Sequence, residues 1–217
     1  MDGIKEIANE VEKVPDNRTN EVIPAFMRDG SLSGVSLEKF TDQLTAQEVQ
    51  EYKIDECTAI AEKHFTPEVL AKWDKMSVDE RSEVYGEYAR DICEALNVTD
   101  KGIKYVSSDS YWGANDGTGL IYLNKVLLED PNNVLKAVDT IAHEERHQFQ
   151  MEAIKNSGKF PMVDSGTLKE WTIAENVYST QESNKYDPWG YRYNPLEMDS
   201  RHFGESIVRN LTRDYII

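Results

Sequence analysis

The chain is organised around residues 130–150, which read DPNNVLKAVDTIAHEERHQFQ. Asp130 can cap a helix N-terminus and Pro131 suits the first helical position, whereas Gly158, beyond the stretch, offers a left-handed stop. The stretch therefore predicts one helix with an HExxH motif near its middle. Apolar residues on the earlier turns should hold this helix in the core: Val134, Leu135, Val138, Ile141 and Ala142.

The HExxH motif places two imidazoles on one face of that helix. His143 and His147 are four residues apart, and side chains at this separation are neighbours, so both can bind one divalent ion. Glu144 lies beside them and can accept a proton from a water molecule at the ion. A zinc hydrolase needs these residue types at this spacing, and we expect Zn²⁺ as the cofactor. The alternative is a helix that happens to carry two surface histidines.

A site with two histidines needs a third protein ligand that leaves one coordination position open. Residues 194–205, NPLEMDSRHFGE, predict a helix whose cap is Asn194 and whose first residue is Pro195. Glu197 lies beside the apolar stripe of this helix and is the preferred third ligand. Gly204 lies on the same face and would let another helix approach closely. The stripe consists of Leu196, Phe203, Ile207 and Leu211.

Alternatives stay open for the acids near this segment. Asn194 and Glu197 also match a capping box, in which the carboxylate closes the helix start. Glu175, on a helix predicted over 167–179, is the rival third ligand. Asp199 is expected either to orient a histidine from outside the ligand set or to be an exposed helix acid.

Aromatic residues are dense between the two motifs. Side chains of this kind usually fill a core. Tyr191 or Tyr193 can instead donate a hydrogen bond to a tetrahedral oxyanion, because each lies just before the third-ligand segment. Both are therefore candidate catalytic residues beside Glu144. The aromatic residues are Trp171, Tyr178, Tyr186, Trp189, Tyr191 and Tyr193.

The first half of the chain predicts helices followed by short strands, and hence an α+β fold that is mainly helical, with a small sheet before the HExxH helix. A strand at this place can bind an extended peptide at its open edge, or can simply cover the core. The predicted helices span 45–65, 66–76 and 77–97, and the predicted strands span 101–107 and 119–123, with a turn-rich segment at 109–117 between them.

Composition limits the kinds of partner. The 217 residues suit one domain, or one domain with a short appendage, and 39% hydrophobic residues are enough for a core. Asp and Glu number 40 against 24 Lys and Arg, which gives a net charge of −16. Nucleic acids and anionic membranes both favour clustered cations, so we expect neither as a main partner. The oligomeric state stays open.

The N-terminal residues 1–36 are expected to form a helix and a linker before a domain over 37–217. Residues 1–13 are acidic and amphipathic and lack the pattern of a signal peptide, and no later run of 18 apolar residues could span a membrane. Cys57 and Cys93 form no CxxC pair and are expected to be buried free thiols. These features favour the cytoplasm, or export without a cleaved N-terminal signal peptide.

The two motifs together resemble the zincin-like metallopeptidases of bacteria, particularly domains of phage-associated and secreted-toxin proteins. In that family an HExxH helix is followed by a segment of the form Asn/Gln-Pro-x-Glu-x-Asp-Ala, and this chain has Ser200 in place of the Ala. The similarity extends over roughly residues 107–210. It implies a gluzincin-type site, with zinc ligands His143, His147 and Glu197 and the catalytic residue Glu144, but it does not supply a substrate. If the chain is a metallopeptidase, its partner is a peptide or protein substrate.

Three functions remain in consideration. The first is a zinc metallopeptidase that hydrolyses peptide bonds with Glu144 as general base. The second is a zincin-fold binding or scaffold module, or a toxin-associated module, with little turnover. The third is a two-metal helical carboxylate protein, in which Glu144-x-x-His147 and Asp199-x-x-His202 would be the paired motifs. This third function leaves His143 unexplained.

Overall fold

The computed structural model of the chain describes residues 44–176 and 188–213. The predicted N-terminal helix and linker over 1–36 lie outside these residues, as do Tyr178 and Tyr186. Within the described part, the protein is mainly helical with one small sheet, as predicted.

The first predicted helix is divided into two. α1 spans Ala46–Glu51 and α2 spans Ile54–His64, and between them Lys53 adopts a left-handed conformation with φ 67°. Arg146, far along the chain, donates hydrogen bonds to the carbonyls of Val49 and Tyr52 at this break. Because the donor lies 94 and 97 positions from these carbonyls, the helical pattern over 45–65 could not predict this contact.

The next two helices agree with their sequence signals to different extents. The predicted helix over 66–76 is reduced to α3, Pro67–Leu70, and a 3-10 turn, η5, Trp73–Lys75. α4 spans Val78–Leu96 and is confirmed: Ser77 and Glu80 form both bonds of a capping box, and Asn97 ends the helix in a left-handed conformation.

Within the described residues, the sheet has three strands in the order β1-β3-β2. β1, Ile103–Val106, pairs in parallel with β3, Ile121–Asn124, and both strands fall within the predicted ranges 101–107 and 119–123 apart from the last residue of β3. β2, Gly113–Asn115, is antiparallel to β3 and forms an edge of the sheet. The segment over 109–117, predicted only as turn-rich, therefore also contains a strand that was not predicted. Gly, Ala and Asn are depleted in strands, so their sequence does not signal β2.

The HExxH stretch forms a turn and then a long helix. After α5, Lys125–Glu129, the Asp130 side chain caps a 3-10 turn, η6, Pro131–Asn133, which leads into α6, Val134–Lys155. The prediction that Gly158 ends the helix in a left-handed conformation was wrong. α6 ends at Asn156 with φ −144°, and Gly158 lies in a 3-10 turn, η7, Ser157–Lys159.

Two of the last three helices, α7 and α9, were predicted, whereas α8 was not. α7 spans Ser165–Asn176, α8 spans Pro188–Arg192 and α9 spans Pro195–Arg213. The Asn194 side chain accepts a hydrogen bond from the Leu196 backbone at 2.9 Å, so the predicted cap of α9 is confirmed. All four residues of the predicted apolar stripe of α9 are buried.

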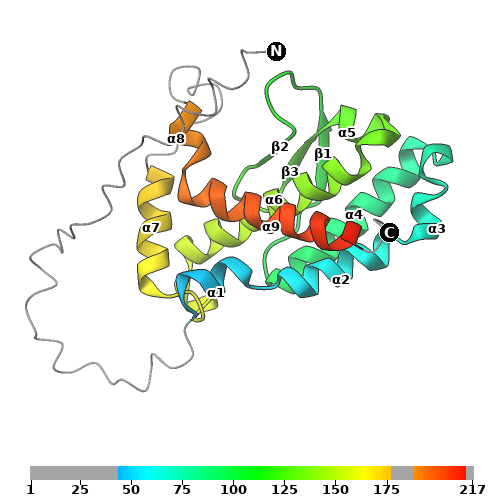
Figure 1. Cartoon of the computed structure of the whole chain (residues 1–217). Coiled ribbons are helices and arrows are strands. Elements are labelled where there is room, and N and C mark those ends of the chain that lie inside the picture. The colour runs from blue at the N-terminus through cyan, green and yellow to red at the C-terminus, as the bar shows by residue number, and fades with distance from the viewer. Residues whose placement is uncertain (1–43, 177–187, 214–217) are drawn as a thin grey trace, which may run out of the picture. The chain divides into compact units, whose positions relative to one another are not determined.

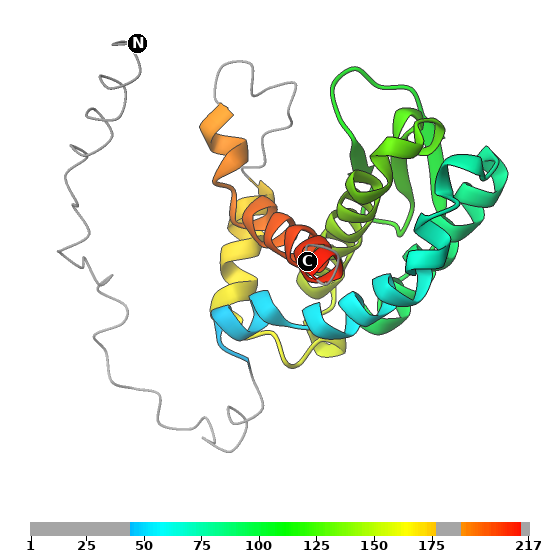
Figure 2. The same cartoon turned by 45° about the vertical axis from the view of Figure 1, so that its right-hand side comes forward.

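α6 is the central element, with the sheet on one side and α9 on the other (Figures 1 and 2). α6 and α9 approach closely at Gly204, where an added Cβ would lie 2.7 Å from the carbonyl oxygen of Asp139. Cys57 and Cys93 are buried free thiols, as predicted. Within the described residues, no helix is both long and apolar enough to span a bilayer.

Candidate metal centre

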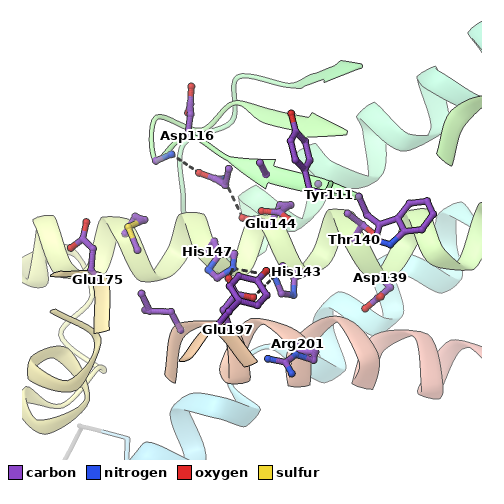
Figure 3. A pocket seen from close by; sticks show the side chains of 18 of the residues that line it. Tyr111, Asp116, Asp139, Thr140, His143, Glu144, His147, Glu175, Glu197 and Arg201 are labelled. Atoms are coloured by element: carbon purple, nitrogen blue, oxygen red, sulfur yellow. Dashed lines mark hydrogen bonds and ion pairs between the residues drawn. The ribbon is translucent and has the colours of Figure 1, made fainter. Parts of the chain in front are cut away.

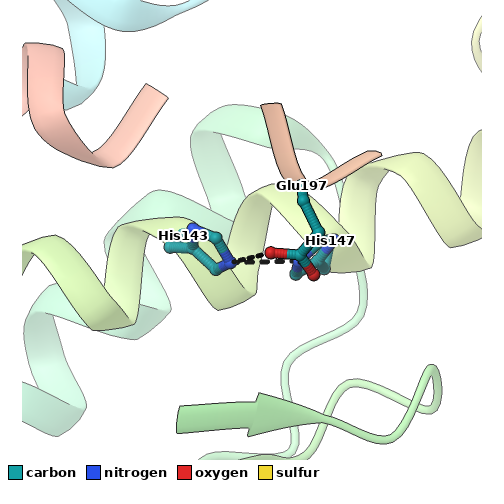
Figure 4. Close-up of side chains that lie close together, drawn as sticks. All are labelled: His143, His147 and Glu197. Carbon is teal, nitrogen blue, oxygen red and sulfur yellow. Dashed lines mark hydrogen bonds and ion pairs between the residues drawn. The ribbon is translucent and has the colours of Figure 1, made fainter. Parts of the chain in front are cut away.

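Three predicted residues come together between α6 and α9, and we call them the triad: His143, His147 and Glu197 (Figure 4). The two imidazole Nε2 atoms are 3.1 Å apart. Glu197 Oε1 lies 3.2 Å from Nε2 of His147, and Glu197 Oε2 lies 3.5 Å from Nε2 of His143. Of the residues that the structure describes, these form the one group with potential metal-binding geometry.

The triad fits a single small divalent ion. Zinc binds imidazole nitrogen and carboxylate oxygen at about 2.0–2.2 Å, so neighbouring donor atoms of a tetrahedral site lie about 3.3–3.5 Å apart. The three distances of 3.1, 3.2 and 3.5 Å match this spacing closely. Three protein donors also leave a fourth position open, as a catalytic site requires.

Charge within the triad favours a cation. Burial raises the pKa of Glu197, but hydrogen bonds from His143 and His147 outweigh burial and hold that pKa well below its usual range. Burial lowers the pKa of His147, but the hydrogen bond to Glu197 and the nearby carboxylates raise it to about 9. A buried anionic carboxylate thus faces two imidazoles, and a divalent ion could bind all three groups.

The capping-box alternative for Glu197 is wrong. The backbone N–H of Asn194, which a capping box would use, donates instead to the carbonyl of Tyr191 at 3.2 Å. The Glu197 carboxylate lies against the histidines, and the residue is only 1% exposed. The rival ligand Glu175 is exposed on α7 and lies away from the triad (Figure 3).

The expectation that Asp199 is an exposed helix acid is wrong, because the residue is buried. Its two carboxylate oxygens accept hydrogen bonds from Nε and Nη2 of Arg146 at 2.8 and 2.9 Å. Oδ2 also accepts one from Gln150, so any effect of Asp199 on a histidine passes through that amide. The Arg146 guanidinium is fully buried between the rings of Phe149 and Phe203. The fourth residue of HExxH therefore joins α6 to α9.

Glu145, the third residue of the motif, points away from the triad. Its carboxylate accepts a hydrogen bond from the Cys93 thiol of α4 at 2.8 Å, and the residue is 1% exposed. Burial raises the pKa of Glu145 to about 8. The two variable positions of HExxH thus serve packing, whereas the three fixed positions face the cleft.

Gln150, which was not predicted as a site residue, contacts the triad at the ring nitrogen of His147 that faces away from Glu197. Gln150 is fully buried, and its side-chain oxygen lies 2.9 Å from Nδ1 of His147. Ser200 places its hydroxyl 3.1 Å from the same nitrogen. The available signal was spacing, because Gln150 follows His147 by three residues and so lies on the same face of the helix.

Glu144 lies on the side of α6 that faces β2. The Asn115 side chain donates a hydrogen bond to the backbone carbonyl of Glu144 at 3.1 Å. A Cβ added at Gly113 would lie 2.8 Å from Oε1 of Glu144, so only glycine lets β2 pass at this distance. Burial raises the pKa of the Glu144 carboxyl, although the nearby histidines oppose this shift.

The triad and Glu144 line one cleft of about 810 Å³ (Figure 3). Residues 110–117 form one wall, and Glu197, Arg201 and Glu205 of α9 form another. Tyr191 also lines the cleft, whereas Tyr193 is 59% exposed and is not among its lining residues. A role for either tyrosine as a hydrogen-bond donor stays a prediction.

The structure does not bring together the residues that a two-metal site would need. Asp199 is paired with Arg146, and His202 instead lies 2.9 Å from Glu51 of α1. Asp199 and His202 therefore supply no second acid-and-histidine pair opposite the HExxH helix. His143, which that arrangement left unexplained, is part of the triad.

No known protein family, curated protein or solved structure matches this chain. The site itself consists of the two histidines of the HExxH helix, a glutamate from a second helix, and Glu144 at the cleft beside them.

Proposed function

We propose that the protein is a zinc-dependent metallopeptidase. The observation that supports this proposal most strongly is the triad, whose donor spacing suits zinc and which opens into a cleft next to a buried glutamate. Zinc held there would polarise a carbonyl group and lower the pKa of a water molecule to about 7. The chain's own residues would supply the remaining chemistry.

Glu144 is the proposed general base. Its pKa is raised by burial, which brings it closer to the pKa that suits proton transfer near neutral pH. In hydrolysis Glu144 accepts a proton from the attacking water and then passes it to the nitrogen of the leaving amine. The hydrogen bond from Asn115 and the contact with Gly113 keep this part of α6 against β2.

The open edge of β2 is the proposed binding site for an extended peptide. Asn124 donates to the carbonyl of Trp112, and Asp116 donates to that of Leu120, so the residues on either side of β2 bond toward β3. In an antiparallel pair such residues alternate, and the backbone groups of Gly113 and Asn115 point away from β3. These groups can pair with a substrate strand along the cleft wall.

The first experiment separates metal binding from chemistry. Glu144→Gln keeps the size of the side chain but removes the base, so we expect normal zinc content and a fall in peptide hydrolysis of about 10²–10⁴-fold. Zinc content is measured after dialysis, and hydrolysis with a mixed peptide library. Wild-type turnover in this variant would refute the role of Glu144. A zinc-loaded wild type that cleaves no peptide would refute the peptidase and favour the binding module.

The third ligand has a matched control in the rival acid. Glu197→Ala should weaken zinc binding by more than about 100-fold. Loss of a residue that only orients a metal ligand typically lowers metal affinity by 10–100-fold, and loss of a ligand itself should lower it further. Glu175→Ala, on the exposed face of α7, should bind zinc like the wild type. Competition with a chelator measures both affinities, and equal affinities in the two variants would contradict the assignment.

Tyr191 is the proposed donor to the oxyanion, since it lines the cleft that holds the triad. Tyr191→Phe should lower kcat by about 100-fold and leave zinc content unchanged. Tyr193→Phe is the control, because Tyr193 is 59% exposed and should have little effect.

A further inference from the structure

Gln150 connects three parts of the metal centre through one amide group. Its Nε2 donates to the carbonyl of Leu196 at 3.0 Å and to Oδ2 of Asp199 at 2.6 Å. Its Oε1 lies 2.9 Å from Nδ1 of His147. The side chain is fully buried, so water does not compete for these bonds.

The orientation of this amide follows from its partners. A backbone carbonyl can only accept hydrogen bonds, and both oxygens of the Asp199 carboxylate already accept hydrogen bonds from Arg146. Both groups therefore require the NH₂ end of Gln150. The oxygen end must then face the imidazole.

That orientation determines which ring nitrogen of His147 carries a proton. An amide oxygen only accepts, so Nδ1 of His147 must donate to it. The Ser200 hydroxyl also donates to Gln150 Oε1, at 3.3 Å, and so does not supply a proton to the ring. Nε2, the atom that faces Glu197 at 3.2 Å, is left to give up its proton to a metal ion.

The two histidines differ in this respect. His143 has no hydrogen-bond partner at Nδ1 in the part of the chain that the structure describes, whereas His147 has two neighbours there. Gln150 also holds the carbonyl of Leu196, the residue directly before Glu197. One amide thus contacts a ligand on α6 and the backbone next to a ligand on α9.

We propose that Gln150 is a positioning residue that fixes the proton of His147 on Nδ1 and sets the distance from His147 to Glu197. This inference rests on the proposed zinc site but does not require that the protein hydrolyse peptides. Because a partner of a metal-binding histidine typically contributes 10–100-fold to metal affinity, Gln150→Leu should weaken zinc binding by about that factor.

Gln148→Leu is the matched control. Gln148 is also a buried glutamine of α6, but its amide donates to Glu152 at 2.9 Å, away from the triad. Both variants remove a buried amide from the same helix, so a general loss of stability should appear in both. Only Gln150→Leu should lower the zinc affinity, measured on the full chain by competition with a chelator.

A nuclear magnetic resonance measurement tests the proton directly. In the zinc-loaded wild type, the ¹H–¹⁵N signal of His147 should show a proton on Nδ1 that exchanges slowly with solvent, and in Gln150→Leu that signal should broaden or vanish. A His147 ring with a bare Nδ1 in the wild type would overturn the inference, even if the variant failed to fold. Equal loss of affinity in the two variants, or none in Gln150→Leu, would overturn it as well. The proposed peptidase function is tested separately: it would be refuted if the zinc-loaded wild type hydrolysed no peptide.

Discussion

The two long faces of α6 hold the candidate site in different ways. The face toward α9 is fixed by buried hydrogen bonds from Arg146 and Gln150 to Asp199. The face toward β2 carries Glu144 and is held by close backbone approach at Gly113. One face thus sets the positions of the metal ligands, and the other keeps a cleft open beside the proposed base. The residues that fix the metal ligands and the residues that border the cleft at Glu144 therefore lie on different faces of α6.

The largest effect is expected on the α9 face. Asp199→Ala would leave the Arg146 guanidinium buried without its carboxylate, which costs about 3–5 kcal/mol of unfolding free energy. Urea unfolding measures this change. Lys63→Ala is the control: Lys63 pairs with Asp91 at the surface, and its side chain is 68% exposed, so its loss should cost at most about 1 kcal/mol. Similar losses in both variants would remove the contrast between buried and exposed pairs.

A medium effect on stability, with a larger one on turnover, is expected on the β2 face. A Cβ at Gly113 would lie 2.5 Å from Cγ2 of Thr140 and 2.8 Å from Oε1 of Glu144. Gly113→Ala should therefore lower the unfolding free energy by about 1–3 kcal/mol and displace Glu144. If the protein is the proposed peptidase, the rate of peptide hydrolysis should fall at least tenfold. Urea unfolding of the same variant measures the change in stability.

Gly86→Ala is the control, and it should raise the unfolding free energy where Gly113→Ala lowers it. Gly86 lies within α4, and an added Cβ there meets nothing within 4 Å, so alanine should stabilise the protein by about 0.5–1 kcal/mol. If Gly113→Ala were as stable and active as the wild type, close packing would not be what shapes the β2 face.

The smallest effect concerns pH at the end of α6. Burial raises the pKa of Glu152, but hydrogen bonds from Lys159, Gln148 and Thr99 outweigh burial and lower it to about 2. Because the unfolded value is about 4.3, the stability from these bonds is complete above that pH and is lost as the pH falls toward 2. After allowance for solvent screening, we expect about 1 kcal/mol.

Comparison of urea unfolding at pH 6 and pH 3 checks this expectation. Glu152→Gln should unfold more easily than the wild type at pH 6 and should show a smaller loss between the two pH values. Glu175→Gln, a change at an exposed acid, should retain the wild-type loss. An unchanged pH dependence in Glu152→Gln would show that another acid is responsible.

Local signals in the sequence predicted the starts of α4 and α9 and the pairing of the two histidines on α6. Ser77 and Asn194 are caps that act on their own neighbours, and both helices begin where these caps predict. The spacing of His143 and His147 is a property of the helix alone. Glu197 could be preferred because the apolar stripe of α9 determines which side of that helix is buried.

Predictions failed wherever a distant partner decides the structure. Lys53 is left-handed where Arg146 binds the neighbouring carbonyls, and nothing near Lys53 in the sequence indicates this partner. β2 forms from residues with weak strand preference because β3 pairs with it and α6 packs beneath it. Asp199 looked like an exposed acid or a partner of a histidine until the position of Arg146 was known.

The sequence by itself determined the helical class of the protein, the HExxH helix and the pairing of His143 with His147, because these depend on periodicity, caps and spacing within about one helical turn. It preferred Glu197 as the third ligand but left Glu175 open. The tertiary structure alone decided that Glu197 faces the histidines, that Asp199 binds Gln150 and Arg146 from the α9 side, and that Gly113 carries a sheet edge past Glu144. Those contacts join residues that are dozens of positions apart, and only the packing of α6 against α9 and β2 brings them within hydrogen-bonding or van der Waals distance.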